Sequence, residues 1–142
     1  MSSTSRWWTA TMLCLESNLL IDALDPERDG HNDAQAFLKR HRDRPLFLPT
    51  VCVWEVLRGP AKRGDEEACR RTAGRLEFGF QLPFDAGAAR EAAAVEVEQK
   101  RKGEPLNVRD YAVAGTVRQY GGRLVTRDGG LESVTDIEVV PY

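Results

Sequence analysis

The sequence predicts a single α/β domain with a small, mainly parallel sheet that is covered by helices on both faces. Short apolar stretches of strand length alternate along the chain with longer stretches of helical period. A length of 142 residues, with 42% hydrophobic and 30% charged residues, suits one globular domain with a proper core. We therefore predict one domain at residues 12–142, preceded by a flexible N-terminal extension at residues 1–11.

The predicted strands are four short apolar stretches, at residues 12–15, 46–48, 124–126 and 137–140. Helical patterns lie between them, and most begin at a residue type that caps helices. The predicted helices are one from Ser17 or Asn18 to Leu24, one from Asp33 to His41, one from Thr50 that stops at Gly59, one from Asp65 toward Phe78, one from Asp85 toward Lys102, and one from Asn107 to Tyr120 that Gly121 and Gly122 end.

The composition excludes several classes of protein. No segment approaches the roughly 20 apolar residues of a membrane span, and the first residues lack a convincing signal-peptide cleavage site. Three cysteines without a CxxC pair argue against a disulfide framework, and two histidines make a zinc site improbable. We therefore predict a cytoplasmic protein. The formal net charge of −2 gives no overall basic footprint, although clustered arginines keep phosphate recognition open.

Four acids are predicted to meet at the carboxyl edge of the sheet, where parallel α/β domains gather functional groups. Glu16 follows the first strand, and Glu55 lies about one turn into the next helix after the second strand. The last helix leads about 15 Å away from Asp110, and the following strand returns about 16 Å to Asp128. Both of these acids therefore reach the same edge.

Carboxylates that converge in this way repel one another unless cations neutralise them. Oxygen ligands favour Mg²⁺ or Mn²⁺ over zinc, and such ions can activate water and neutralise charge on a phosphodiester. Asn18 and Thr126 are placed to orient a carboxylate or a bound water. Taken singly, Asp110 also fits a helix-terminal acid and Asp128 a turn aspartate. Only the whole set points to a metal site.

Four stretches of the sequence resemble the PIN-domain ribonucleases, especially the small toxins of bacterial and archaeal toxin–antitoxin pairs (the VapC type). They are "LESNLLID" at 15–22, "VCVWEVLRG" at 51–59, "VRDYAVAGTVRQYGGRLVTRD" at 108–128 and the closing "IEVVPY". The resemblance covers nearly all of residues 12–142. It implies an α/β/α sandwich, metal-dependent RNA cleavage, a homodimer, and inhibition by a small antitoxin whose tail fills the active-site groove.

The resemblance also assigns roles to single residues. It implies that the catalytic and metal-binding acids are Glu16, Glu55, Asp110 and Asp128, supported by Asn18 and Thr126. Arg58 and Arg127 are our own candidates for phosphate contact. The chain departs from the family pattern at Glu16, where Asp is usual, and at Ser17, where Thr is more usual. One extra methylene displaces a carboxylate by about an ångström, enough to cost on the order of 100-fold in rate.

Two other functions fit parts of the sequence. A catalytically impaired PIN-like module that binds RNA or a partner protein would explain Glu16. A receiver-like signalling domain would use the acidic pocket, but it needs a Lys near the last strand, and the lysines lie elsewhere. The sequence does not distinguish RNA from DNA as the substrate, because it contains no recognisable motif that would bind the 2′-hydroxyl of RNA.

Overall fold

The computed structural model describes residues 12–142, so the predicted extension at residues 1–11 lies outside the described part. The chain forms a five-stranded sheet in the order β3-β2-β1-β4-β5, and every neighbouring pair of strands is parallel. The strands are β1 (Leu13–Leu15), β2 (Leu46–Pro49), β3 (Phe80–Leu82), β4 (Arg123–Val125) and β5 (Glu138–Val140). The predicted parallel α/β class is confirmed.

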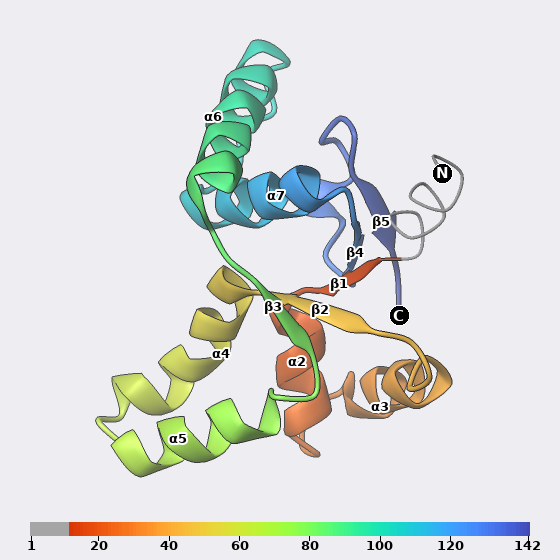
Figure 1. Cartoon of the computed structure of the whole chain (residues 1–142), viewed down its shortest axis with the longest axis vertical. Helices are drawn as coiled ribbons and strands as arrows, with labels where there is room; N and C mark the ends of the chain where they lie inside the picture. Colours follow the sequence, from red (N-terminus) through yellow and green to blue (C-terminus); the bar gives the residue numbers. More distant parts are fainter. Residues whose placement is uncertain (1–11) are drawn as a thin grey trace.

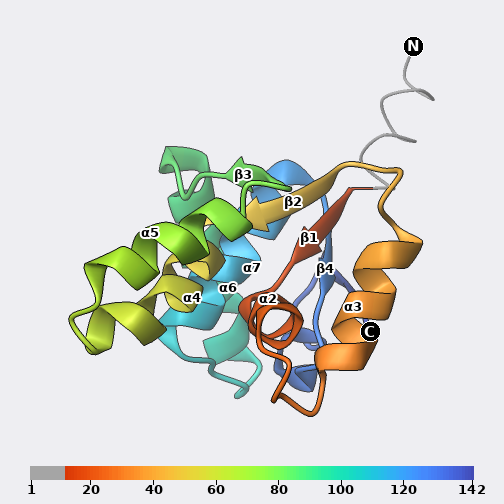
Figure 2. The same ribbon diagram turned by 90° about the horizontal axis from the view of Figure 1, so that it is seen from below.

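Helices cover both faces of this sheet and make a three-layer sandwich. Figure 1 shows α6 and α7 on one side of the strands and α2, α3, α4 and α5 on the other. Figure 2 looks onto the second face, with α6 and α7 behind the sheet. The helices are α2 (Ser17–Leu24), α3 (His31–Arg40), α4 (Thr50–Lys62), α5 (Glu66–Arg75), α6 (Ala86–Arg101) and α7 (Val108–Tyr120), and a short 3-10 turn, η1, covers Gly129–Leu131.

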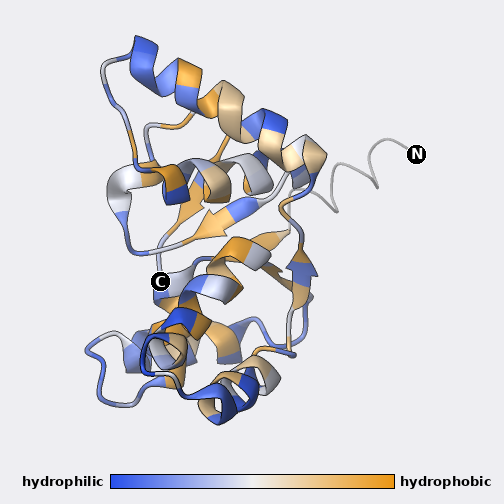
Figure 3. Ribbon diagram, turned by 90° about the vertical axis from the view of Figure 1, so that its left-hand side faces the viewer, coloured by the Kyte–Doolittle hydropathy of each residue, from blue (hydrophilic) through white to orange (hydrophobic). Residues whose placement is uncertain are grey.

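The core lies around β1, the central strand, whose three residues are all buried. Strands covered on both faces are expected to be continuously apolar rather than alternating, and both β1 and β2 fit this pattern. In Figure 3 the middle of the molecule is mainly orange, whereas the peripheral loops and helix ends are mainly blue. Cys14 and Cys52 are free and buried here, as expected, and burial raises the pKa of the Cys14 thiol to about 12.

Several predicted boundaries were wrong. The edge strand β3 was not predicted, because its first two residues are exposed and it lacks an apolar run. Helix α4 passes Gly59 and also Pro60, since proline here removes one hydrogen bond only a few residues before the helix ends at Lys62. Gly30 precedes α3 in place of the predicted cap Asp33. The cap of α2 is Glu16, one residue before the predicted Ser17 or Asn18.

Helices α6 and α7 pack at very short range. A Cβ on Gly115 of α7 would lie 2.6 Å from the carbonyl oxygen of Ala88 and from the amide nitrogen of Ala92, both in α6. Only glycine permits this approach of the two backbones. Arg118 fastens the pair through ion pairs to Glu91 and Glu98. Within residues 12–142, none of the helices combines the length and apolar character needed to cross a bilayer.

Candidate metal-dependent nuclease site

The four predicted acids all lie at the carboxyl edge of the sheet. Glu16 directly follows β1, Glu55 lies in the second turn of α4, Asp110 lies in the first turn of α7, and Asp128 precedes η1. They are close enough to influence one another electrostatically. Glu16 and Asp110 raise the pKa of Glu55, and Asp128 and Glu16 raise the pKa of Asp110. The parallel sheet therefore brings together acids that are far apart in the sequence.

Glu16 is buried and firmly held. Its backbone N–H donates to the carbonyl of Val125 in β4 at 3.1 Å, which ties the end of β1 to the neighbouring strand. Its Oε2 atom accepts from the Ser17 hydroxyl at 2.8 Å and from the backbone N–H of Asn18 at 3.2 Å, so the side chain caps α2. Its Oε1 atom accepts from the Thr126 hydroxyl at 3.3 Å. The longer acid thus reaches the site and serves as a helix cap at the same time.

Thr126 connects three parts of this edge. Its hydroxyl oxygen accepts from the Asn18 side-chain amide at 3.1 Å and from the backbone N–H of Asp128 at 3.0 Å. The Asp128 carboxylate in turn accepts from the N–H of Gly130 at 3.0 Å and caps η1. Because Thr126 also donates to Glu16, it sets the distance between the loop that carries Asp128 and the end of β1. Both predicted supporting residues, Asn18 and Thr126, lie beside the acids.

Glu55 has a partner that the sequence did not reveal. Its side chain is only 7% exposed, and the Arg109 Nε atom lies 2.6 Å from its Oε2 atom. Burial raises the pKa of Glu55 above the usual range, and the Arg109 guanidinium and the Ser17 hydroxyl oppose that shift. Because Ser17 also contacts Glu16, its single proton can serve only one of the two acids at a time. Arg109 therefore acts as an internal counter-ion for one of the four acids.

Asp110 is the next residue and is less completely neutralised. Its backbone N–H donates to the Asn107 side chain at 2.8 Å, which confirms Asn107 as the cap of α7. Burial is the main cause that raises the pKa of Asp110, Arg109 opposes it, and the charges of Asp128 and Glu16 add to it. An acid whose pKa is raised by other carboxylates is stabilised when a cation binds between them.

These side chains surround a cavity of about 410 Å³. Glu16, Glu55 and Asp128 contribute acidic groups to its wall, and Asp110 lies beside them. Its basic residues are Arg58, Lys62 and Arg109. Arg58 was predicted, whereas Lys62 and Arg109 were not. The cavity therefore joins acidic groups with basic groups of the kind that bind phosphate.

Arg127, the second predicted phosphate contact, is paired with Asp22 instead of lining the acidic cavity. Its guanidinium lies 3.1 Å from the Oδ2 atom of Asp22, whose side chain is fully buried. Arg28 pairs with Oδ1 of Asp22 at 3.1 Å, and the Tyr142 hydroxyl donates to Oδ2 at 2.6 Å. We call Asp22, Arg28, Arg127 and Tyr142 the Asp22 cluster. It occupies the guanidinium of Arg127 and anchors the residue that precedes Asp128.

The donors at the acidic edge fit a hard divalent cation. The acids offer carboxylate oxygens, and the raised pKa values of Glu55 and Asp110 come first from burial and then from the neighbouring carboxylates, whose charge a cation would relieve. Among residues 12–142, no three Asp, Glu, His or Cys side chains stand close enough to form a metal site by themselves. A cation at this edge would therefore be held by one or two carboxylates and by waters, as Mg²⁺ usually is.

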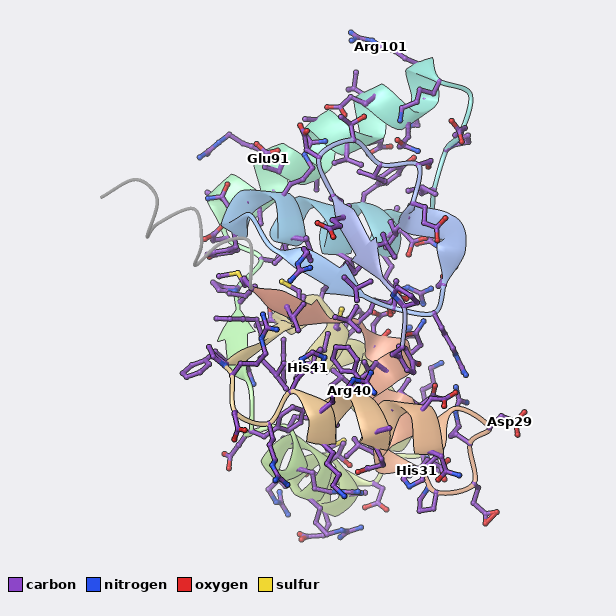
Figure 4. The ribbon with its side chains drawn as sticks, turned by 90° about the vertical axis from the view of Figure 1, so that its right-hand side faces the viewer. Asp29, His31, Arg40, His41, Glu91 and Arg101 are labelled. Atoms are coloured by element: carbon purple, nitrogen blue, oxygen red, sulfur yellow. The ribbon has the colours of Figure 1, made fainter. Side chains whose placement is uncertain are left out.

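The two histidines take no part in this edge. His31 begins α3 and His41 follows its last residue, and Figure 4 shows both on α3. The His31 ring bonds the backbone carbonyl of Asp22 at 2.8 Å, and the His41 ring stacks on Phe37. Both histidines thus make local contacts away from the acids.

Comparisons with known proteins agree with this architecture. A family model described as the PIN domain matches residues 13–137. Among solved structures, VapBC2 from Rickettsia felis bound to a promoter DNA fragment has a TM-score of 0.77 at 15% identity, covering 93% of this chain and 99% of that one. A toxin–antitoxin complex from Klebsiella pneumoniae has a TM-score of 0.67 at 20% identity, with coverages of 90% and 95%.

A third structure is VapC20 from Mycobacterium tuberculosis, described as a toxin that cleaves the sarcin–ricin loop. It has a TM-score of 0.68 at 12% identity, covering 88% of this chain and 98% of that one. A search of curated protein sequences finds no match. At these identities the structural likeness establishes the fold, and the family model establishes the family.

Proposed function

The chain belongs to the PIN domain family, and from that premise we propose that it is a metal-dependent endoribonuclease and the toxin of a toxin–antitoxin pair. The observation that carries the proposal is the set of four mutually repelling carboxylates at one edge of the sheet, beside a cavity with basic side chains. Such a site attracts a divalent cation and, through the cation and the basic groups, a phosphodiester. The description of VapC20 as a toxin that cleaves the sarcin–ricin loop supports RNA as the substrate.

The chain's own residues have distinct roles in this proposal. Asp110 and Asp128 hold the cation, Glu16 completes its surroundings, and Asn18 and Thr126 fix the orientation of Glu16. Glu55, which is paired with Arg109, orients the attacking water or holds the cation. Arg58 contacts the phosphate. When bound, Mg²⁺ or Mn²⁺ would lower the pKa of a coordinated water and neutralise charge on the phosphate oxygens.

The decisive experiment measures cleavage of a labelled structured RNA by the purified chain with Mg²⁺, Mn²⁺ or EDTA. We expect cleavage that requires the metal and that falls at least 100-fold in Asp110→Asn. Asp29→Asn is the matched control, because Figure 4 shows the Asp29 side chain pointing away from the body of the molecule. Unchanged cleavage in Asp110→Asn would contradict the assignment. Parallel assays with DNA of the same sequence decide between the two substrates.

A second candidate function is favoured by the bonding of Glu16. Its carboxylate already accepts three hydrogen bonds, from Ser17, Asn18 and Thr126, and it is almost inaccessible to solvent. A catalytically impaired module that binds RNA or a partner protein fits this arrangement. In that case Glu16→Asp gains metal-dependent cleavage that the natural chain lacks. If both forms cleave RNA, the nuclease is the better description.

We also propose a protein partner and a dimer. The fold is shared with a toxin–antitoxin complex, which supports an antitoxin that binds at the acidic cavity and blocks it. A cationic antitoxin side chain would complement the acids. The homodimer is tested by sedimentation velocity of the purified chain, where a single species at the monomer mass of 15.9 kDa would contradict it.

A further inference from the structure

A second hollow, of about 450 Å³, adjoins the acidic cavity. Val51, Trp54, Val108 and Ala112 form its apolar wall, so it lies between α4 and the start of α7. The two hollows share Arg58 and Arg109. A molecule that extends from one hollow into the other therefore passes these two guanidinium groups.

The apolar wall contains side chains that the core does not use. Trp54 is 58% exposed and Val108 is 82% exposed, whereas Cys52, Val53 and Val56 supply the buried side of α4. A single exposed apolar residue needs no explanation, but an exposed tryptophan and valine that line one hollow beside a charged site do. Folding does not require an indole at position 54.

The indole carries a second recognition group. The Arg58 guanidinium carbon lies 5.2 Å from the centre of the Trp54 ring, within the range of a cation–π contact. Unpaired nucleobases are held by stacking on aromatic rings or on arginine planes. The hollow contains the indole with the guanidinium over its face, and its basic border matches the phosphate that joins one nucleotide to the next.

We infer that this hollow binds a nucleobase of a single-stranded RNA segment whose neighbouring phosphate lies in the acidic cavity. The inference rests on the proposed nuclease function and deepens it, because it names unpaired RNA as the substrate. Trp54 stacks on the base, Val108 contacts its edge, and Arg58 and Arg109 lie beside the linking phosphate. Stacking of this kind tolerates different bases, so the hollow selects for an unpaired nucleotide rather than for one sequence.

A protein occupant is the rival explanation. An antitoxin helix or a second copy of the chain would also cover exposed apolar side chains. The shared arginines favour RNA, because a protein helix that packs on Trp54 and Val108 would have to leave two guanidinium groups beside an apolar contact. A polynucleotide instead supplies a phosphate for those groups at the point where the two hollows meet.

The test combines a variant with a matched ligand. Equilibrium binding of a labelled single-stranded RNA is measured in EDTA, so that no cleavage occurs, for the natural chain, Trp54→Ala and Trp54→Phe. A second set of RNAs carries one abasic nucleotide at each position in turn. We expect Trp54→Ala to weaken binding by about tenfold or more and Trp54→Phe to retain most of the affinity. Phe78→Ala is the control, because it removes an exposed aromatic ring outside both hollows.

The abasic series identifies the occupant. At one position, an abasic nucleotide should weaken binding to the natural chain. The same RNA should bind Trp54→Ala no more weakly than the intact RNA does, because both changes remove the same contact. In metal, Trp54→Ala should raise KM with little change in kcat, since stacking holds the substrate without touching the reacting bond.

Other outcomes overturn the inference. Equal RNA affinity of Trp54→Ala and the natural chain does so, and a changed oligomeric state of Trp54→Ala with unchanged RNA affinity assigns the hollow to a protein contact. Absence of RNA binding by the natural chain also overturns it. Binding that depends on Trp54, without cleavage in Mg²⁺ or Mn²⁺, supports the base site while contradicting the nuclease, so the two failures are distinguishable.

Discussion

Two groups of charged residues meet in the loop after β4, and their charges are balanced in opposite ways. The acidic edge has four carboxylates and one paired arginine, Arg109, and it opens into a cavity. The Asp22 cluster has one carboxylate, two arginines and a tyrosine hydroxyl, and its acid is fully buried. At the acidic edge the carboxylates outnumber the arginine that pairs with them, whereas in the Asp22 cluster the single carboxylate has three partners.

The difference separates a group that binds from a group that holds the structure. A buried charge with complete partners is costly to break, whereas repelling acids at an open edge lower stability and favour ligand binding. The two groups meet in consecutive residues, because Arg127 belongs to the Asp22 cluster and Asp128 belongs to the acidic edge. The ion pairs of the Asp22 cluster thus hold the position of Asp128, which belongs to the acidic edge. Four substitutions test this contrast.

Asp22→Asn should have the largest effect. It removes the anion that Arg28 and Arg127 share, and because both guanidinium groups stay partly exposed, the loss of these charged hydrogen bonds costs about 2–3 kcal/mol. The free energy of unfolding from urea titration measures the loss. Asp29→Asn, nearby but exposed, is the control. A loss below about 1 kcal/mol would show that the cluster does not hold the structure.

Gly30→Ala should have the next largest effect on stability. A Cβ at this position would overlap the Asp22 carboxylate and lie 2.6 Å from the Arg127 Nη1 atom, so the cluster would have to move. Overpacking of this kind costs about 1–3 kcal/mol. Thermal unfolding checks the prediction, with Gly59→Ala as the control because no atom lies within 4 Å of its added Cβ. Equal melting temperatures for the two variants would refute the tight packing.

Arg109→Gln tests the internal counter-ion of the acidic edge. The Arg109 guanidinium opposes the burial that raises the pKa of Glu55, so this pKa should rise further without it. A carboxyl-detected NMR titration measures it, and stability at neutral pH should fall by about 1 kcal/mol. An unchanged pKa would mean that Arg109 does not neutralise Glu55 in solution.

Asp110→Asn should have the smallest effect and the opposite sign. The pKa of Asp110 is raised in the folded chain, so stability falls as the pH rises from its unfolded pKa to its folded pKa. In EDTA at neutral pH, the amide variant should therefore be more stable by about 0.5–1 kcal/mol. The gain should vanish at low pH, where both forms are neutral. A destabilised variant at pH 7 would contradict the proposed repulsion.

Sequence reasoning could place the four acids because it needed only one geometric rule. Parallel strands end at one edge, and Glu16 directly follows β1 while Asp128 comes shortly after the neighbouring strand β4, which ends at Val125. The rule says nothing about contacts between helices. The pairing of Arg109 with Glu55 depends on how α7 crosses α4, and no sequence spacing reveals it.

The Asp22 cluster was missed for a related reason. Asp22 follows an apolar run, as an ordinary surface acid of an amphipathic helix would, and its partners come from a loop, the end of β4 and the last residue. Their convergence is a tertiary property. Strand β3 was missed because an edge strand with exposed side chains lacks the apolar run that identified the others.

The pairing between β1 and β4 also determines at which stage of folding the four acids come together. Glu16 and Glu55 are synthesised first, whereas Asp110 and Asp128 follow later, together with the strand β4 that accepts the N–H of Glu16. Contacts between segments so distant in sequence form late in folding, because closing the long loop costs entropy first. An incomplete chain therefore contains half of the acids and no frame to hold them. The four acids are therefore held together only once the first and fourth strands have paired.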